Sequence, residues 1–346
     1  MDVYIGTYTK DSNSEGIYRA SFDPSAGTLE LKGLAATIEN PSFMVLDSQK
    51  PVLYSVAEEH EGMVVSLKIL DDGTLSELSR VPSGGSSACH LATAFLGRQV
   101  LAANYLSGTV SSMKVSEDGI IDPQVHTVQH KGSSVNPNRQ EGPHAHSVNV
   151  DPEGKRVLVA DLGVDRVITY LMDEETAELS AENQHSGAVA PGSGPRHMAY
   201  HPNGSIVYCV NELSSTVTVF AYRPGSRLDA VQTVSALPAD FQGESHSADI
   251  HVHPSGGFVY SSNRGDDSIA IFRISEASGK LGFVGVVSTE GRTPRNFAVT
   301  PDGRYILAAN QDSDNIVVLS LDENGMPAPT GCEVNVPKPV CVLLRE

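Results

Sequence analysis

Short apolar runs, rich in β-branched and aromatic residues, recur along the chain and are separated by polar turns. The fullest copy lies within residues 192–217, where the turn HPNG (201–204) leads into the apolar run 206–210 and then into Asn211 and Glu212. Apolar and polar residues alternate over 216–222, which is the period of a half-buried strand. The pattern predicts a small antiparallel sheet with short connections.

The same unit recurs through the chain. When the repeats are aligned, the residues that end the second strand fall in one column, which we call the repeat column. These positions lie 47 to 57 residues apart and are Thr7, Ala57, Asn104, Asp161, Asn211, Asn263 and Asn310. A period near fifty, with several short strands in each repeat, is typical of a β-propeller. We therefore expect an all-β fold, a seven-bladed propeller with four antiparallel strands per blade, as one domain over residues 1–346.

The first repeat lacks an innermost strand, because no apolar run precedes residue 3. The C-terminal segment 339–344 has the pattern of 195–200 and 294–299, and no further repeat follows it. A ring with a gap would expose strand edges to solvent. The sequence thus predicts that the C-terminal strand joins the N-terminal blade and closes the ring.

Composition narrows the classes of partner. The chain has 42 Asp and Glu against 24 Lys and Arg, a formal net charge of −18, which argues against nucleic acid or an anionic membrane as a partner. No apolar segment is long enough to span a bilayer and the first residues enter a strand, so we expect a cytoplasmic protein without a signal peptide. Four cysteines lack zinc-site spacing and are expected to be buried free thiols: Cys89, Cys209, Cys332 and Cys341.

Blade geometry predicts which polar residues meet. The turns between first and second strands lie at one end of the channel, and we expect His201 and His253 there as turn residues. At the other end, the starts of first strands meet the ends of second strands. This group comprises His144, His146, Arg196, His197, His246 and Arg295 with Asn104, Asp161, Asn211, Glu212, Asn263, Arg264 and Asn310. Arginines and histidines that converge in so acidic a protein favour a binding site for a small anion.

Other interpretations apply to parts of this group. Asx side chains often bond loop backbone, and we favour that role for Asn104, Asp161 and Asn310. His144 and His146 form a His-x-His on a strand, which can hold zinc, but no Cys or Glu stands at the spacing that would complete such a site. We expect no metal and no cofactor. The long irregular insert 126–142 is expected to form a rim or lid near the site.

Several segments carry a family resemblance: YIGTYT (4–9), EGPHAHSVNVDPEGK (141–155), GSGPRHMAYHPNG (192–204), NELSSTV (211–217), SSNRGDDSIAIF (261–272) and TPRNFAVTPDGRYILAANQDSDNI (293–316). Across essentially its whole length the chain resembles the propeller-type 6-phosphogluconolactonases, and it is similar to the propeller-type carboxymuconate lactonizing enzymes. The resemblance implies a seven-bladed propeller that hydrolyses 6-phospho-D-glucono-1,5-lactone, a small anionic sugar lactone, in the pentose phosphate pathway.

The resemblance also implies a set of site residues. The catalytic His, two Arg and Glu of the lactonizing enzymes match His144, Arg196, Arg264 and Glu212. Lactone hydrolysis needs an activated water, a stabilised oxyanion and a protonated leaving oxygen. We predict His144 as acid and base, Glu212 as a base or orienting group, and the arginines on carbonyl and phosphate. Substrate-binding residues are predicted to be His146, His197, Asn211, His246, Asn263 and Arg295.

Two other functions remain open from the sequence. A lactonizing cycloisomerase would use the same cations to bind the carboxylates of a muconate. A non-catalytic binding scaffold would present aromatic or arginine anchors on its rim, whereas this chain has no Trp and concentrates its polar residues near the axis. The expected oligomeric state is a monomer or a weak dimer.

Overall fold

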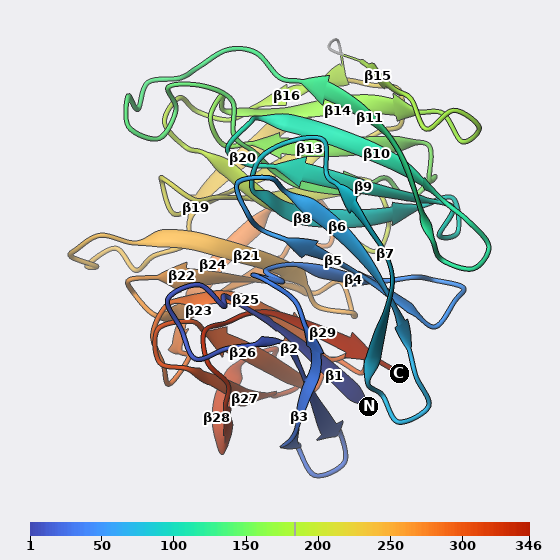
Figure 1. Ribbon diagram of the computed structural model, residues 1–346. Coiled ribbons are helices and arrows are strands. Elements are labelled where there is room, and N and C mark those ends of the chain that lie inside the picture. Colours follow the sequence, from blue (N-terminus) through green and yellow to red (C-terminus); the bar gives the residue numbers. More distant parts are fainter. Residues whose placement is uncertain (183–184) are drawn as a thin grey trace.

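The computed structural model describes residues 1–182 and 185–346, which form seven antiparallel sheets (Figure 1). The innermost strands contact one another in a closed ring. In ring order they are β4 (Met44–Leu46), β8 (Ala88–Ala94), β12 (Ala145–Val150), β17 (Pro195–Tyr200), β21 (His246–Val252), β25 (Pro294–Val299) and β29 (Pro339–Arg345). The seven-bladed propeller predicted from the repeat is confirmed.

Each innermost strand pairs with a second strand, which in turn pairs with a third. The second strands are β1 (Asp2–Thr7), β5 (Val52–Ala57), β9 (Gln99–Asn104), β13 (Arg156–Asp161), β18 (Ile206–Asn211), β22 (Phe258–Arg264) and β26 (Tyr305–Asn310). The third strands are β2 (Gly16–Asp23), β6 (Met63–Ile69), β10 (Thr109–Val115), β14 (Arg166–Met172), β19 (Thr216–Ala221), β23 (Ser268–Ile274) and β27 (Asn315–Leu321).

The outer strands are β3 (Thr28–Thr37), β7 (Leu75–Pro82), β11 (Ile121–Gln129), β15 (Leu179–Ala181), β16 (Gly187–Ala188), β20 (Asp229–Ser235), β24 (Leu281–Ser288) and β28 (Pro327–Asn335). One blade departs from the expected four strands, because β15 and β16 both pair with β14.

The apolar runs of the second and third strands are buried on both faces. In β5, for example, Leu53 packs toward the preceding blade with Tyr4, whereas Tyr54 packs toward the following blade with Val100. Successive side chains of a strand point to opposite faces. A blade held between two others therefore requires a nearly continuous apolar run, and this requirement explains the repeated pattern in the sequence.

The ring closes as predicted. Strand β29 pairs antiparallel with β1, with Val3 opposite Leu344 and Ile5 opposite Val342. The two termini accordingly lie close together in Figure 1. Two strands from opposite ends of the chain thus share one sheet, and no innermost strand is missing.

The turn histidines connect neighbouring blades. His201 Nε2 donates to the carbonyl of Gly256 at 3.1 Å, and His253 Nε2 donates to that of Gly303 at 2.9 Å. Both therefore serve as turn residues, as expected. Of the four free cysteines three are buried, but Cys332 is only half-buried on the outer strand β28, so the expectation of burial was wrong for that residue.

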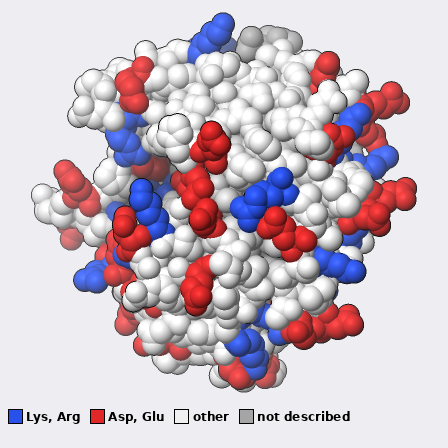
Figure 2. All heavy atoms as spheres, viewed as in Figure 1, with Lys and Arg blue, Asp and Glu red and all other residues white. Residues whose placement is uncertain are grey.

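The described part of the chain contains no helix that could cross a membrane. On the face shown in Figure 2, basic side chains lie scattered among acidic ones rather than in one continuous patch.

Candidate active site

A cavity of about 270 Å³ opens where the first strands begin and the second strands end. It is lined by Glu58, Cys89, Tyr105, Arg139, His146, Glu212, His246, Arg264 and Arg295. A small recess adjoins it, of about 10 Å³, lined by Tyr8, Ser42, Phe43, Glu58, Cys89, His146, Arg196, His197, Arg295, Asn296 and Val340. Four residues line both spaces and mark their junction: Glu58, Cys89, His146 and Arg295.

Glu212 is buried among three arginines. Its Oε1 accepts from Arg139 at 2.6 Å, and its Oε2 accepts from Arg196 at 2.9 Å and lies 3.1 Å from Arg264 Nη2. Burial alone would raise the pKa of Glu212, but the surrounding positive charges hold it well below its usual range. The carboxylate is therefore ionised at neutral pH and holds the guanidinium groups in place.

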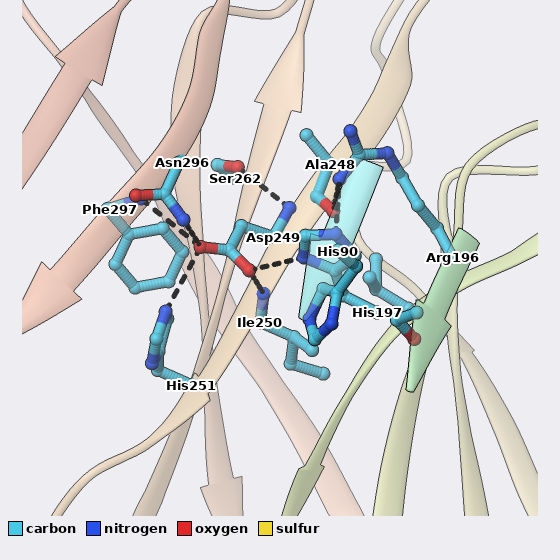
Figure 3. A network of polar contacts seen from close by, with 12 residues as sticks. His90, Arg196, His197, Ala248, Asp249, Ile250, His251, Ser262, Asn296 and Phe297 are labelled. Atoms are coloured by element: carbon cyan, nitrogen blue, oxygen red, sulfur yellow. Dashed lines mark hydrogen bonds and ion pairs between the residues drawn. The ribbon is translucent and has the colours of Figure 1, made fainter. Parts of the chain in front are cut away.

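Arg196 is fixed by contacts on several sides (Figure 3). Besides its ion pair with Glu212, its Nη1 donates to the carbonyl of Ala248 at 2.6 Å and to His197 Nε2 at 3.2 Å. The imidazole can accept this bond because its other nitrogen carries the proton, and His197 Nδ1 donates to Asp249 Oδ1 at 2.8 Å. Burial and the adjacent Arg196 lower the pKa of His197 to about 4, so the ring is neutral.

Asp249 links this arrangement to the ring closure. Its Oδ2 accepts from Asn296 Nδ2 at 2.6 Å and from His251 Nε2 at 3.0 Å (Figure 3). The Oδ1 of Asn296 accepts from the backbone N–H of Val342 in β29 at 2.7 Å. A continuous chain of hydrogen bonds therefore runs from the closing strand, through Asp249 and His197, to the guanidinium of Arg196.

His146 faces the junction of cavity and recess. Its Nδ1 lies 3.9 Å from Cys89 Sγ, and no residue within the described ranges forms a hydrogen bond with its Nε2. Burial and the charge of Arg196 hold the pKa of His146 well below its usual range. The site therefore contains a neutral imidazole with a nitrogen available to a ligand or a water.

His144, predicted as the catalytic histidine, lines neither space. Its Nδ1 donates to the carbonyl of Tyr105 at 3.0 Å, its Nε2 lies 3.1 Å from Glu141 Oε1, and its ring stacks on that of Tyr105. The prediction assumed that His144 and His146 share one face of a regular strand. The pairing register of β12 shifts between Ala145 and Ser147, so this segment is not regular.

That register shift recurs in most blades at the same place. A β-bulge leaves one residue unpaired and redirects its side chain. In β8, β12, β17, β25 and β29 the residues skipped by the pairing are Cys89, His146, Arg196, Arg295 and Val340. All five line the recess. The repeated bulge therefore aims one side chain of each of these blades at the axis.

The remaining predicted substrate-binding residues divide into two groups. His197, His246 and Arg295 line the cavity or the recess. Asn211 and Asn263 are fully buried and line neither space, and their contact with substrate stays a prediction. Asn211 Nδ2 donates to hydroxyls of β19, and Asn263 accepts from the Ser247 hydroxyl at 2.6 Å.

Asn104, Asp161 and Asn310 of the repeat column form hydrogen bonds with loop backbone. Asn104 donates to the carbonyl of Ser83, Asn310 donates to that of Thr289, and Asp161 accepts from the backbone of His144. These contacts confirm the structural role expected for all three.

Arg264 and Arg295 provide cations at the open part of the site. Arg264 Nε donates to the carbonyl of His246 at 3.1 Å, and burial, partly offset by Glu212, lowers the pKa of Arg264 to about 10. The Arg295 guanidinium lies 5.2 Å from the ring centre of Tyr8. Burial alone would lower the pKa of Arg295, but Tyr8 and Glu58 raise it. Both side chains therefore carry a positive charge at neutral pH.

Sequence reasoning missed nine lining residues: Tyr8, Ser42, Phe43, Glu58, Cys89, Tyr105, Arg139, Asn296 and Val340. A signal for three of them was present. Tyr8, Glu58 and Tyr105 each follow a position of the repeat column directly, as Glu212 and Arg264 do. Cys89 occupies a bulge. Arg139 comes from the insert 126–142, and its contact with Glu212 places this part of the insert at the rim of the site. The insert is not irregular throughout, because residues 126–129 belong to β11.

Within residues 1–182 and 185–346, no three His, Cys, Asp or Glu side chains are grouped so that they could hold a metal ion.

Comparisons with known proteins agree with this architecture. Residues 2–344 match the family model of the seven-bladed β-propeller lactonases. The chain is 38% identical over 343 residues to 6-phosphogluconolactonase of Bacillus subtilis (98% of this chain, 97% of the relative) and 33% identical over 327 residues to that of Formosa agariphila (92% of each). The structure of the periplasmic gluconolactonase PpgL of Pseudomonas aeruginosa superposes with a TM-score of 0.93 at 34% identity, covering 99% of this chain and 98% of that one. The chain belongs to the lactonase family of seven-bladed β-propellers.

Proposed function

We propose that the protein hydrolyses 6-phospho-D-glucono-1,5-lactone to 6-phosphogluconate in this cavity, without a metal. The observation that carries the proposal is a neutral histidine, His146, with a free ring nitrogen in a strongly cationic cavity. The relatives named above support lactone hydrolysis. In the cell the reaction would belong to the pentose phosphate pathway of the cytoplasm.

The charge of the site favours a phosphorylated lactone. Four arginines face only two glutamates in the cavity and recess, which leaves two positive charges uncompensated: Arg139, Arg196, Arg264 and Arg295 against Glu58 and Glu212. A phosphate monoester carries nearly two negative charges at neutral pH. We assign its binding to Arg264, Arg139 and His246 in the open cavity, where guanidinium groups can form paired hydrogen bonds with its oxygens.

We assign the acid and base chemistry to His146 rather than to His144. The free Nε2 of His146 accepts a proton from water as the water oxygen attacks the lactone carbonyl carbon. Arg196, held toward the recess by Glu212 and His197, stabilises the negative charge that develops on the carbonyl oxygen. The bond from that carbon to the ring oxygen then breaks, and the protonated His146 returns the proton to the leaving oxygen.

Glu212 has a positioning role in this scheme. Its oxygens are occupied by three guanidinium groups. We therefore assign to Glu212 the orientation of Arg139, Arg196 and Arg264 relative to one another.

A substrate panel tests the proposal. Initial rates are measured with 6-phosphogluconolactone, gluconolactone and carboxymuconate, each corrected for spontaneous hydrolysis. We expect the largest kcat/KM for the phosphorylated lactone. Greater turnover of carboxymuconate would instead identify a cycloisomerase, and no turnover by a folded protein would favour a binding scaffold.

A further inference from the structure

Glu58 is a second carboxylate in the site, and the proposed hydrolysis does not use it. It directly follows β5 and lines both the cavity and the recess. Its Oε2 accepts from the Tyr8 hydroxyl at 3.0 Å and from the Ser42 hydroxyl. No described residue donates a hydrogen bond to its Oε1. The carboxylate is therefore fixed through one oxygen, and the other remains available to a ligand.

The two glutamates of the site differ in charge compensation. Three guanidinium groups lie within 3.1 Å of the Glu212 carboxylate. In the described part of the chain, no Lys, Arg or His nitrogen forms an ion pair with Glu58. The hydrogen-bond partners of Glu58 are uncharged hydroxyls. Its charge raises the pKa of Arg295, but no described guanidinium forms an ion pair with the carboxylate, so its negative charge also acts on a ligand at the junction of cavity and recess.

The reaction changes the charge of the ligand at that junction. Glu58 and His146 are two of the four residues that line both spaces, so a water bound at His146 and the carbon it attacks lie close to Glu58. The lactone carbonyl group is uncharged. Addition of water and cleavage of the ring C–O bond yield a carboxylic acid, which loses one proton to solvent. The product therefore carries one more negative charge than the substrate, on the carbon that reacted.

We propose that Glu58 is a specificity-determining residue that favours the uncharged lactone over its carboxylate product and so promotes product release. The inference rests on the proposed function. Ring hydroxyls of the sugar can donate to the free Oε1 in a charge-assisted bond, whereas a carboxylate at the same place is repelled. Repulsion of this kind is a common source of specificity. It also disfavours ligands with several carboxylates, such as muconates.

The test compares Glu58→Gln with Glu61→Gln. Glu61 is an exposed glutamate of the same loop and lines neither space, so its variant is a matched control. Product inhibition by 6-phosphogluconate and KM for 6-phosphogluconolactone are measured for both variants and the wild type. In Glu58→Gln we expect the inhibition constant to fall about tenfold, since a close like charge is removed, while KM changes by less than about threefold. Glu61→Gln should match the wild type.

Calorimetric binding of 6-phosphogluconate separates this inference from the proposed function, because it requires no turnover. If the wild type is inactive but 6-phosphogluconate binds more tightly to Glu58→Gln than to the wild type, the proposed hydrolysis is rejected and the role of the Glu58 charge is supported. An active wild type with equal product affinity in Glu58→Gln would overturn the inference alone. A hundredfold loss of kcat at unchanged product affinity would also overturn it, because Glu58 would then act on the reacting water. Glu58→Ala, which also removes the charge, serves if the amide variant does not fold.

Discussion

Most side chains of the cavity and the recess come from two repeated positions of the blade. One is the bulge of the innermost strand, which supplies Cys89, His146, Arg196 and Arg295. The other directly follows the repeat column and supplies Tyr8, Glu58, Tyr105, Glu212 and Arg264. At both positions the side chain is released from the blade-to-blade packing, because it lies at a bulge or beyond the regular apolar run. These positions can therefore carry polar chemistry without a loss of core packing.

The two histidines of the His-x-His segment provide the sharpest test at the scale of the residue. We expect His146→Ala to lower kcat by about 10²–10⁴, because the proton acceptor of the attacking water is removed. His144→Ala is the matched control, since His144 lies behind Tyr105 with both ring nitrogens engaged, and its kcat should fall less than about tenfold. Steady-state rates corrected for spontaneous hydrolysis decide the question. The reverse ranking would return the catalytic role to His144.

The pH profile supplies a second readout of His146. A general base acts in its deprotonated form, so activity is present above its pKa and is lost as pH falls through that value. Because burial and Arg196 hold the pKa of His146 well below its usual range, kcat/KM should be flat from pH 8 down to about 6.5 and decline only below it. Unphosphorylated gluconolactone is the better substrate here, since a phosphate titrates near pH 6. A decline centred above pH 6.5 would contradict the assignment.

At the scale of the element, the closing strand β29 supports both the fold and the site. It pairs with β1 and, through Val342, donates to Asn296 at the end of the network that holds Arg196. Closure of the ring and orientation of a site arginine therefore depend on the same segment of chain. A propeller that loses this strand would expose the edge of β1 to solvent.

Removal of residues 339–346 should abolish cooperative thermal unfolding, because the ring opens and an apolar edge is exposed. If the truncated chain is insoluble, the substitution Val342→Pro perturbs β29 less severely and can be measured instead. It removes the donor to Asn296 Oδ1 and leaves that buried acceptor unsatisfied, which should lower the free energy of unfolding by about 1–3 kcal/mol. Melting curves by circular dichroism measure both changes, and removal of Glu346 alone, which lies outside β29, is the control. An undisturbed melting transition in the long truncation would show that closure does not stabilise the ring.

At the scale of the whole molecule, the charge of the site opposes that of the protein. The chain carries a formal charge of −18, yet the cavity and recess together hold an excess of positive charge. The cluster is built by Glu212, which brings three arginines of different segments within reach of one carboxylate. Mutual repulsion of these arginines is a cost to folding that a bound anion relieves.

An anionic ligand should therefore stabilise the fold. When the 6-phosphogluconate concentration is about a hundred times its Kd, binding adds about 2.7 kcal/mol to the free energy of unfolding. This gain corresponds to a rise in Tm of about 2–4 °C. Gluconate, which lacks the phosphate, should raise Tm less. Arg264→Ala should lose most of the difference between the two ligands, whereas Arg304→Ala, on an exposed turn, should retain it. Equal shifts for both ligands in the wild type would mean that the arginines do not recognise the phosphate.

The sequence alone determined the architecture. The repeat of about fifty residues and its apolar runs predicted the seven blades, because both features are local and occur many times, and the C-terminal strand without a following repeat predicted how the ring closes. The same repeat placed Arg196, Glu212 and Arg264 at one end of the channel, where the structure brings them into contact. Polar residues that recur at the same position of each repeat identify which end of each strand faces the site.

Only the tertiary structure decided which side chains meet there. Alternation along a strand predicted one face for His144 and His146, but the bulge in β12 separates them, and a bulge depends on pairing with the neighbouring strand. The contact between Arg139 and Glu212 joins residues 73 positions apart, and no local pattern encodes it. The site lies on the axis where all the blades converge, so its composition follows from the closing of the ring rather than from any single stretch of sequence.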